Sequence, residues 1–342
     1  MSDSMQLPPA VVVADAEFAT ATKELAARFP AFDLHCLAAG QSPAELASRR
    51  IVGLVAQDVT VDSAYLAMLP DLRALIKLGR NYANIDADAV RQRGLAFGAV
   101  ARKGPNCVAE LAMTMILALS KDLLISHQSV AEGAYRLRGL RPEPTAQWKM
   151  AFHWMRHMRL HEVYGKRLGI VGMGEIGYEL ARRANVMGMD VSYTKRRPLS
   201  DEVERSVGVR RAPLSDLLRE SDYVCLAVPH TTETERMIGA TELALMKSDA
   251  YLVNICRGGV VDEDALIDAL RSGRLAGAGL DVFTYEPLPA DSPLCQLDNV
   301  ILTPHVGGGS GTTRAGELAI ALEELQQVLG GAAPQIDLGR AR

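Results

Sequence analysis

The chain has no apolar segment long enough to cross a membrane and no signal for export. Its longest stretch without a charged residue runs from Asn299 to Thr313 and contains Pro304, so no part of the sequence predicts a membrane-spanning helix. The first residues lack a basic start followed by an apolar run, which is the pattern of a secretory signal. We therefore expect a cytoplasmic protein that is not integral to a membrane.

Cysteines are few and widely separated, and none of them forms a C-x-x-C pair. Five cysteines occur in 342 residues: Cys36, Cys107, Cys225, Cys256 and Cys295. This odd number and spacing exclude a disulfide framework and a structural zinc site as the basis of the fold. We expect these cysteines to act as small, buried apolar residues.

Positive charge is not in excess. The chain has 37 Lys and Arg against 41 Asp and Glu, a formal net charge of −4, so it lacks the overall cationic field of nucleic-acid-binding proteins. Its 48% of hydrophobic residues is ordinary for a globular protein, and its length predicts about two domains.

Short apolar runs alternate with helical patterns along the whole chain, which predicts α/β structure with parallel sheets. An N-terminal series places strands at 11–13, 51–55 and 75–78, followed by a long apolar helix over 106–120. A second series begins at Lys166, with strands expected at 168–171, 191–194, 223–228, 251–255, 278–282 and 300–303.

An amphipathic helix over 313–329 follows the last strand and could return to the N-terminal domain. We therefore predict two Rossmann-like, doubly wound domains. Residues 1–104 plus 310–342 would form a discontinuous substrate-binding domain, and residues 105–309 a dinucleotide-binding domain.

A glycine-rich turn opens the second series. Gly172, Gly174 and Gly177, with Glu175 and Ile176 between the last two, match G-x-G-x-x-G directly between an apolar strand and a helix. In that context the helix N-terminus binds the phosphates of a dinucleotide.

The next strand ends in Thr194, Lys195 and Arg196 and has no acidic residue there. An enzyme that uses NAD typically has a carboxylate at this position, and that carboxylate would repel a 2′-phosphate. Lys195 and Arg196 could instead pair with the phosphate. The sequence thus favours NADP(H), with NAD(H) possible; the other interpretation is a solvated basic loop.

Three further blocks follow the glycine turn: Asn254 to Glu263, Gly279 to Pro287, and Thr303 to Gly308. Arg257 precedes Glu286 by 29 residues, and Glu286 precedes His305 by 19. In residue type, order and spacing these blocks resemble the D-isomer-specific 2-hydroxyacid dehydrogenases. The resemblance covers most of the chain.

The resemblance implies a catalytic set of Arg257, Glu286 and His305. His305 would move the proton at the keto or hydroxyl oxygen, Glu286 would orient His305, and Arg257 would bind the substrate carboxylate. It also implies that Asp281 faces the nicotinamide carboxamide. Further cofactor contacts are expected from Val228, Pro229, Thr234, Ile255, Cys256, Gly307 and Gly308.

The resemblance implies reduction of a small 2-keto acid to a D-2-hydroxy acid, of the glyoxylate/hydroxypyruvate reductase type. Glutamate at position 286 disfavours formate oxidation, because the related formate dehydrogenases carry glutamine there. An alternative from another class is a dinucleotide-sensing protein similar to the corepressors that share this fold.

One loop departs from the family pattern. The family binds the substrate carboxylate with a G-x-G loop, whereas this chain has Gly79, Arg80 and Asn81. Arg80 could enter the pocket and favour a non-carboxylate anion such as phosphite, or it could face solvent while the backbone binds the substrate. Both interpretations stay open.

Residues 135–167 are strongly basic and contain Trp148 and Trp154. The resemblance places this segment at a homodimer interface. His153, His157 and His161 are four residues apart and could share one helix face, but no nearby Cys or Asp completes a metal site. We therefore expect no metal.

Overall fold

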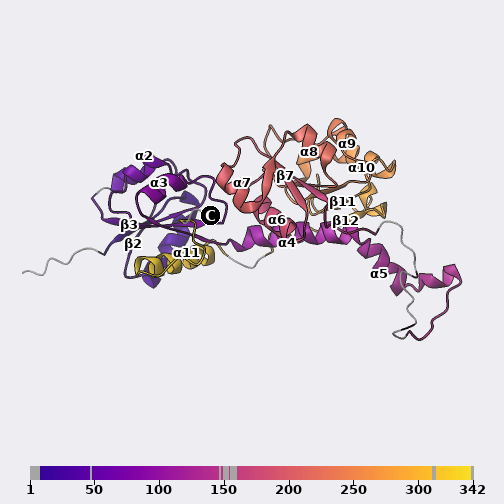
Figure 1. The fold of residues 1–342 in the computed structure, drawn as a ribbon, viewed down its shortest axis with the longest axis horizontal. Helices are drawn as coiled ribbons and strands as arrows, with labels where there is room; N and C mark the ends of the chain where they lie inside the picture. The colour runs from indigo at the N-terminus through magenta and orange to yellow at the C-terminus, as the bar shows by residue number, and fades with distance from the viewer. Residues whose placement is uncertain are drawn as a thin grey trace, which may run out of the picture. The chain divides into compact units, whose positions relative to one another are not determined.

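The computed structural model describes residues 8–46, 48–145, 148, 154, 160–309 and 313–339. They form two compact units (Figure 1). The first unit takes in the described residues of Met1–Asn106, Leu199–Ser206 and Ser310–Arg342, and the second those of Cys107–Pro198 and Val207–Gly309. The prediction placed residues 199–206 in the second domain, whereas the structure places them in the first unit. The roles assigned to the two units stay predictions.

The first unit is built on five parallel strands in the order β2-β1-β3-β4-β5. The strands are β1 (Ala10–Val13), β2 (Asp33–Cys36), β3 (Ile51–Ala56), β4 (Ala74–Leu78) and β5 (Ala96–Val100). The helices of this unit include α1 (Ala19–Leu25), α2 (Ser63–Ala67), α3 (Ala87–Gln92) and α11 (Arg314–Leu329).

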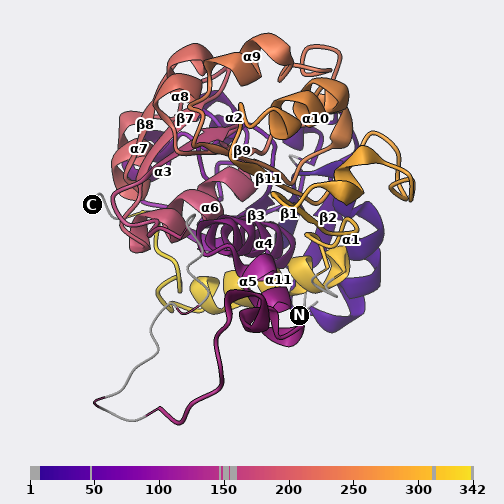
Figure 2. The same cartoon turned by 90° about the vertical axis from the view of Figure 1, so that its right-hand side faces the viewer.

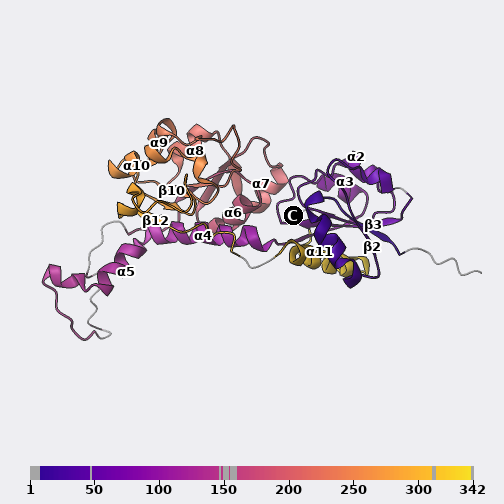
Figure 3. The same cartoon turned by 180° about the vertical axis from the view of Figure 1, so that it is seen from behind.

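Helix α11 completes the first unit from the far end of the chain, as predicted (Figures 1 and 3). Thr313 caps it by accepting a hydrogen bond from the Gly316 N–H. Its buried residues Leu318, Leu322 and Leu325 join the core formed by β1, β3 and β4. At Gly53 a Cβ atom would lie 2.7 Å from Leu325 Cδ2, so glycine permits the close approach of helix and sheet.

The second unit is built on seven parallel strands in the order β12-β11-β10-β9-β6-β7-β8. The strands are β6 (Arg167–Val171), β7 (Asp190–Thr194), β8 (Val209–Arg211), β9 (Tyr223–Leu226), β10 (Tyr251–Asn254), β11 (Gly277–Leu280) and β12 (Val300–Leu302). Its helices include α4 (Lys103–Ser120), α5 (Leu123–Ala131), α6 (Glu175–Val186), α8 (Leu214–Glu220), α9 (Ala240–Leu245) and α10 (Glu263–Arg271). The first residues of α4 belong to the first unit, and so does α7 (Asp201–Val207) except for Val207.

The strand order reverses at β6, which pairs with β7 on one side and β9 on the other. In open parallel sheets this reversal creates a crevice at the carboxyl ends of the strands, where ligands bind. Since all seven strands are parallel, the segments that follow β6, β7, β9, β10, β11 and β12 meet at that edge.

The two-domain α/β fold predicted from the sequence is confirmed. Among the described residues, no helix is long and apolar enough to cross a membrane.

Candidate active site

The glycine turn lies between β6 and α6, as predicted, and each glycine has a separate physical reason. Gly172 has φ of +101°, and a Cβ there would lie 2.5 Å from the Ala227 carbonyl oxygen. A Cβ at Gly177 would lie 2.4 Å from the Gly172 oxygen. Nothing surrounds the Cβ position of Gly174, the N-cap residue of α6. The turn therefore leaves open space at a helix N-terminus, where a pyrophosphate can bind.

The end of β7 carries the basic residues Lys195 and Arg196. Arg196 is exposed, whereas Lys195 is partly buried. Burial lowers the pKa of Lys195, and the nearby Glu175 carboxylate opposes that shift. Of the two cations, Arg196 is therefore the one more accessible to solvent.

The Arg257 turn follows β10, and the buried side chain of Asn254 shapes it. Asn254 Nδ2 donates to the Arg257 carbonyl at 3.1 Å, and its Oδ1 accepts from the Cys256 N–H at 3.1 Å. Arg257 itself is exposed, and its Nη1 donates to the Cys256 carbonyl at 2.6 Å. Sequence reasoning gave Asn254 no role of its own; its position as the last residue of an apolar strand was the available signal.

His305 and Glu286 form a hydrogen-bonded pair. His305 Nδ1 lies 2.7 Å from Glu286 Oε2, and Glu286 Oε1 accepts from the Phe283 N–H at 3.1 Å. Partial burial raises the pKa of Glu286, but these two hydrogen bonds outweigh it and hold that pKa below its ordinary value. Glu286 therefore stays ionised at neutral pH and fixes Nδ1 of the imidazole, which leaves Nε2 for chemistry.

Asp281 follows β11 and is only 2% exposed. Its Oδ1 accepts from the Thr303 hydroxyl at 2.5 Å and the Val306 N–H at 2.9 Å, and its Oδ2 accepts from the Gly307 N–H at 2.9 Å. The Asp281 carbonyl accepts from the His305 N–H at 2.9 Å. Asp281 thus holds the loop on both sides of His305, which has the left-handed φ of +53°. The contact with a nicotinamide carboxamide stays a prediction.

The loop after β9 contains Val228, Pro229 and Thr234. Thr234 Oγ1 donates to the Pro229 carbonyl at 2.6 Å and accepts from the Thr231 N–H at 2.8 Å, which closes the loop. The Arg236 N–H then donates to the Gly259 carbonyl at 2.8 Å, so this loop is attached to the Arg257 turn.

Ile255 and Cys256 are buried at the same edge of the sheet. Burial raises the pKa of the Cys256 thiol to about 11, so the thiol is neutral at physiological pH. Gly307 packs against Asp281, and Gly308 follows it in the loop.

Gly79, Arg80 and Asn81 lie at the carboxyl end of β4 in the first unit, whereas all the other predicted site residues belong to the second. Gly79 has φ of +100°, and its N–H donates to the Val100 carbonyl at 2.8 Å. Asn81 is buried, and its Oδ1 accepts from the Ala83 N–H at 3.2 Å.

Of the three spaced histidines, His153 and His157 lie outside the described residues. The Nε2 atom of His161 is 2.6 Å from the hydroxyl of the buried Tyr223, and the imidazole stacks on Tyr251. No group of His, Cys, Asp and Glu side chains in the described part of the chain is arranged to hold a metal ion.

Comparison with known proteins agrees with this geometry. The model of the D-isomer specific 2-hydroxyacid dehydrogenase family, NAD binding domain, matches residues 113–307. Glyoxylate/hydroxypyruvate reductase B of Yersinia enterocolitica is 40% identical over 282 residues, which cover 82% of this chain and 81% of that protein.

Two solved structures are similar over nearly the full length. The TT0316 protein from Thermus thermophilus has a TM-score of 0.51 and 32% identity, with 96% of this chain and 99% of that chain covered. A glyoxylate reductase from Paecilomyes thermophila has a TM-score of 0.53 and 25% identity, with 97% and 99% covered. The chain belongs to the D-isomer specific 2-hydroxyacid dehydrogenase family and is an NAD(P)-dependent oxidoreductase that acts on CH–OH groups.

Proposed function

We propose that the protein reduces small 2-keto acids to D-2-hydroxy acids with NADPH, and that glyoxylate and hydroxypyruvate are among its substrates. The observation that carries the proposal is the hydrogen-bonded pair of His305 and Glu286 at the same sheet edge as Arg257 and the glycine turn. The reductase names of the relatives support the choice of substrates.

The nicotinamide cofactor supplies the hydride when it is bound. The protein supplies the proton: His305 gives up the proton on Nε2 to the oxygen that becomes the hydroxyl, because Nδ1 is already bonded to Glu286. The ionised Glu286 stabilises the protonated imidazole before transfer. In the oxidation direction the same nitrogen accepts the proton.

Arg257 binds the carboxylate of the keto acid and polarises its carbonyl. The exposed guanidinium has a planar fork of N–H groups that matches two oxygens, which a lysine ammonium does not provide.

The loop Gly79–Asn81 stays a predicted contact of the substrate, through either its backbone or the Arg80 guanidinium. The Gly79 N–H itself donates to the Val100 carbonyl.

The preference for NADPH is supported by the end of β7. Thr194, Lys195 and Arg196 offer two cations and a hydroxyl where a carboxylate would repel the 2′-phosphate. The exposed Arg196 is the more accessible of the two cations, since Lys195 is partly buried.

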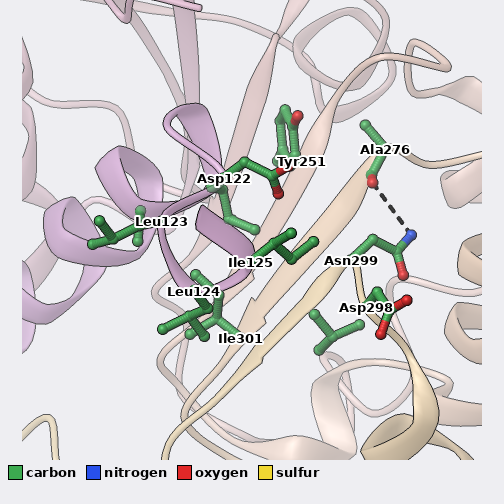
Figure 4. A pocket seen from close by; sticks show the side chains of 12 residues that line it. Asp122, Leu123, Leu124, Ile125, Tyr251, Ala276, Asp298, Asn299 and Ile301 are labelled. Atoms are coloured by element: carbon green, nitrogen blue, oxygen red, sulfur yellow. Dashed lines mark hydrogen bonds between the residues drawn. The ribbon is translucent and has the colours of Figure 1, made fainter. Parts of the chain in front are cut away.

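A homodimer is supported by apolar side chains that the second unit exposes. Figure 2 shows residues 132–145, which follow α5, leaving the body of the unit. Leu123 and Leu124 are 52% and 53% exposed, and Leu137 is 91% exposed. Near the first residues of α5, Ile125 and Tyr251 line a pocket at the amino ends of β10, β11 and β12 (Figure 4). Exposed apolar side chains of this kind are typical of an interface.

The five cysteines are all free, which supports a cytoplasmic location. Cys225 and Cys256 are buried as expected, whereas Cys295 is exposed, so the expectation of burial is wrong for Cys295.

Replacing either Arg257 or His305 by alanine should lower kcat/KM for glyoxylate by at least about 10²-fold, because each contributes to the transition state. NADPH binding, measured by fluorescence titration, should stay within about threefold. Turnover like that of the wild type in Arg257→Ala or His305→Ala would contradict the mechanism.

In the same assay Arg80→Ala should lower kcat/KM for glyoxylate less than about threefold if the backbone of its loop binds the substrate, and far more if its guanidinium does.

Glu286→Gln should lower the reduction rate at least about tenfold, because a neutral amide cannot stabilise positive charge on the imidazole to which it is hydrogen-bonded. Because the pKa of Glu286 is lowered, its stabilising contribution is present above the ordinary carboxyl pKa and is lost only as the pH falls through the lower folded value. A wild-type reduction rate in Glu286→Gln would show that the reaction does not need this carboxylate.

Changing Lys195 and Arg196 together to glutamine should raise KM for NADPH at least about tenfold and leave KM for NADH within about twofold. Arg219→Gln combined with Arg271→Gln, at exposed positions of α8 and α10, removes the same two charges; this control should change neither constant. Equal effects on both cofactors would identify the basic run as solvated surface.

Leu124→Asp combined with Leu137→Asp should convert the dimer to a monomer, since two charges would be buried at the interface. Light scattering after size-exclusion chromatography measures the mass directly. Val186→Asp, at an exposed apolar position on α6, is the matched control and should leave the mass unchanged. A monomeric wild type would overturn this assignment.

A further inference from the structure

The second unit holds another histidine–carboxylate pair, to which the reaction gives no role. His230 and Glu235 lie in the loop after β9, and His230 Nε2 is hydrogen-bonded to Glu235 Oε2. Both side chains are partly exposed. Among the described residues, neither forms an ion pair with His305 or Glu286.

The His230 ring packs against the turn that carries Arg257. A Cβ at Gly259 would lie 2.6 Å from His230 Cε1 and 2.7 Å from His230 Nε2, so the ring occupies the place of a side chain at position 259. Contact this close is possible only because residue 259 is a glycine.

Gly258, the preceding residue, packs just as closely against the backbone of Phe283 and Thr284. A Cβ there would lie 1.9 Å from the Phe283 carbonyl carbon. The Phe283 N–H in turn donates to Glu286 Oε1. The two glycines after Arg257 therefore contact the loop that holds Glu286 and the ring of His230.

Backbone hydrogen bonds attach the rest of the loop to the turn. The Arg236 N–H donates to the Gly259 carbonyl at 2.8 Å, and the Ile238 N–H to the Val260 carbonyl at 3.2 Å. Glu235 directly precedes this attachment, so its bond to His230 ties the ring to a fixed backbone. Without Glu235 the ring could rotate away from Gly259.

We propose that His230 and Glu235 are positioning residues for Arg257. The pair confines Gly259, as Phe283 confines Gly258, and so fixes the guanidinium where it binds the carboxylate of the keto acid. Neither residue acts on the substrate itself, and the proposal rests on the proposed function, since it assigns the carboxylate to Arg257.

The test compares Glu235→Ala, Glu235→Gln and His230→Ala with Thr232→Ala, a control at an exposed position of the same loop. Three quantities are measured for each: KM and kcat for glyoxylate, KM for NADPH, and the Kd of oxalate for the NADPH-saturated enzyme by calorimetry. Oxalate carries the carboxylate but is not reduced, so its binding reports on the arginine without turnover. Thermal melting checks that each variant is folded.

Glu235→Ala and His230→Ala should raise KM for glyoxylate and Kd for oxalate about tenfold, the effect of losing one charge-assisted hydrogen bond. kcat and KM for NADPH should change less than about threefold, and Glu235→Gln, which keeps a hydrogen bond to the ring, should recover most of the loss. In an Arg257→Ala background, Glu235→Ala should add no further loss, because its effect passes through the arginine.

An equal loss with and without Arg257, or a rise confined to KM for NADPH, would overturn the positioning role. Wild-type affinity for oxalate in both alanine variants would overturn it too. These results leave the proposed function intact. If the wild-type enzyme neither reduces glyoxylate nor binds oxalate, the proposed function fails and this inference fails with it.

Discussion

The active site depends on one buried carboxylate. Asp281 lies at the end of β11, and its oxygens bind the Thr303 hydroxyl and the N–H groups of Val306 and Gly307. A buried carboxylate is stable only when hydrogen bonds replace its hydration, and here the loop after β12 provides them. His305, between these donors, is thereby held in a left-handed backbone conformation that few side chains adopt. The position of the imidazole that we propose to transfer the proton is thus set by Asp281, at the end of the neighbouring strand.

The parallel sheet explains why separate parts of the sequence act together. Each functional segment of the second unit follows a strand, and the carboxyl ends of β6, β9, β10, β11 and β12 share one edge. The same edge gives each residue a different environment. Asp281 and Asn254 are buried and fix the backbone, whereas Arg257 and His305 are exposed. Rigid support beneath exposed reactive groups is the arrangement that keeps catalytic geometry constant.

Most of this architecture could be predicted from the sequence, because buried parallel strands are continuous apolar runs and the turns carry glycine. The strands β2, β5 and β8 were not predicted. β2 (Asp33–Cys36) and β8 (Val209–Arg211) are edge strands with polar residues, so their pattern is not that of a buried strand. β5 (Ala96–Val100) is the other edge strand of the first sheet, and Gly98 interrupts its apolar side chains. A Cβ atom at Gly98 would lie 2.7 Å from Pro334 Cβ.

In the candidate site, too, some features could be predicted from the sequence and others could not. The types and spacing of Arg257, Glu286 and His305 were available to sequence reasoning, and so was the glycine turn. The hydrogen bonds of Asp281 and the contact of His230 with Gly259 were not, since they join residues whose separation in the chain says nothing about their distance in space. Both are tertiary contacts of loops, which follow from the strand order and not from any local pattern.

The most direct measurement of the central claim is the absorbance of the reduced nicotinamide when the wild-type enzyme meets 2-keto acids. The account predicts rapid oxidation of NADPH with glyoxylate and with hydroxypyruvate, the second giving D-glycerate, and slower oxidation of NADH. Tight binding of NADPH without oxidation by any 2-keto acid would contradict it. Reduction of NADP⁺ by phosphite, with no keto acid consumed, would contradict it as well.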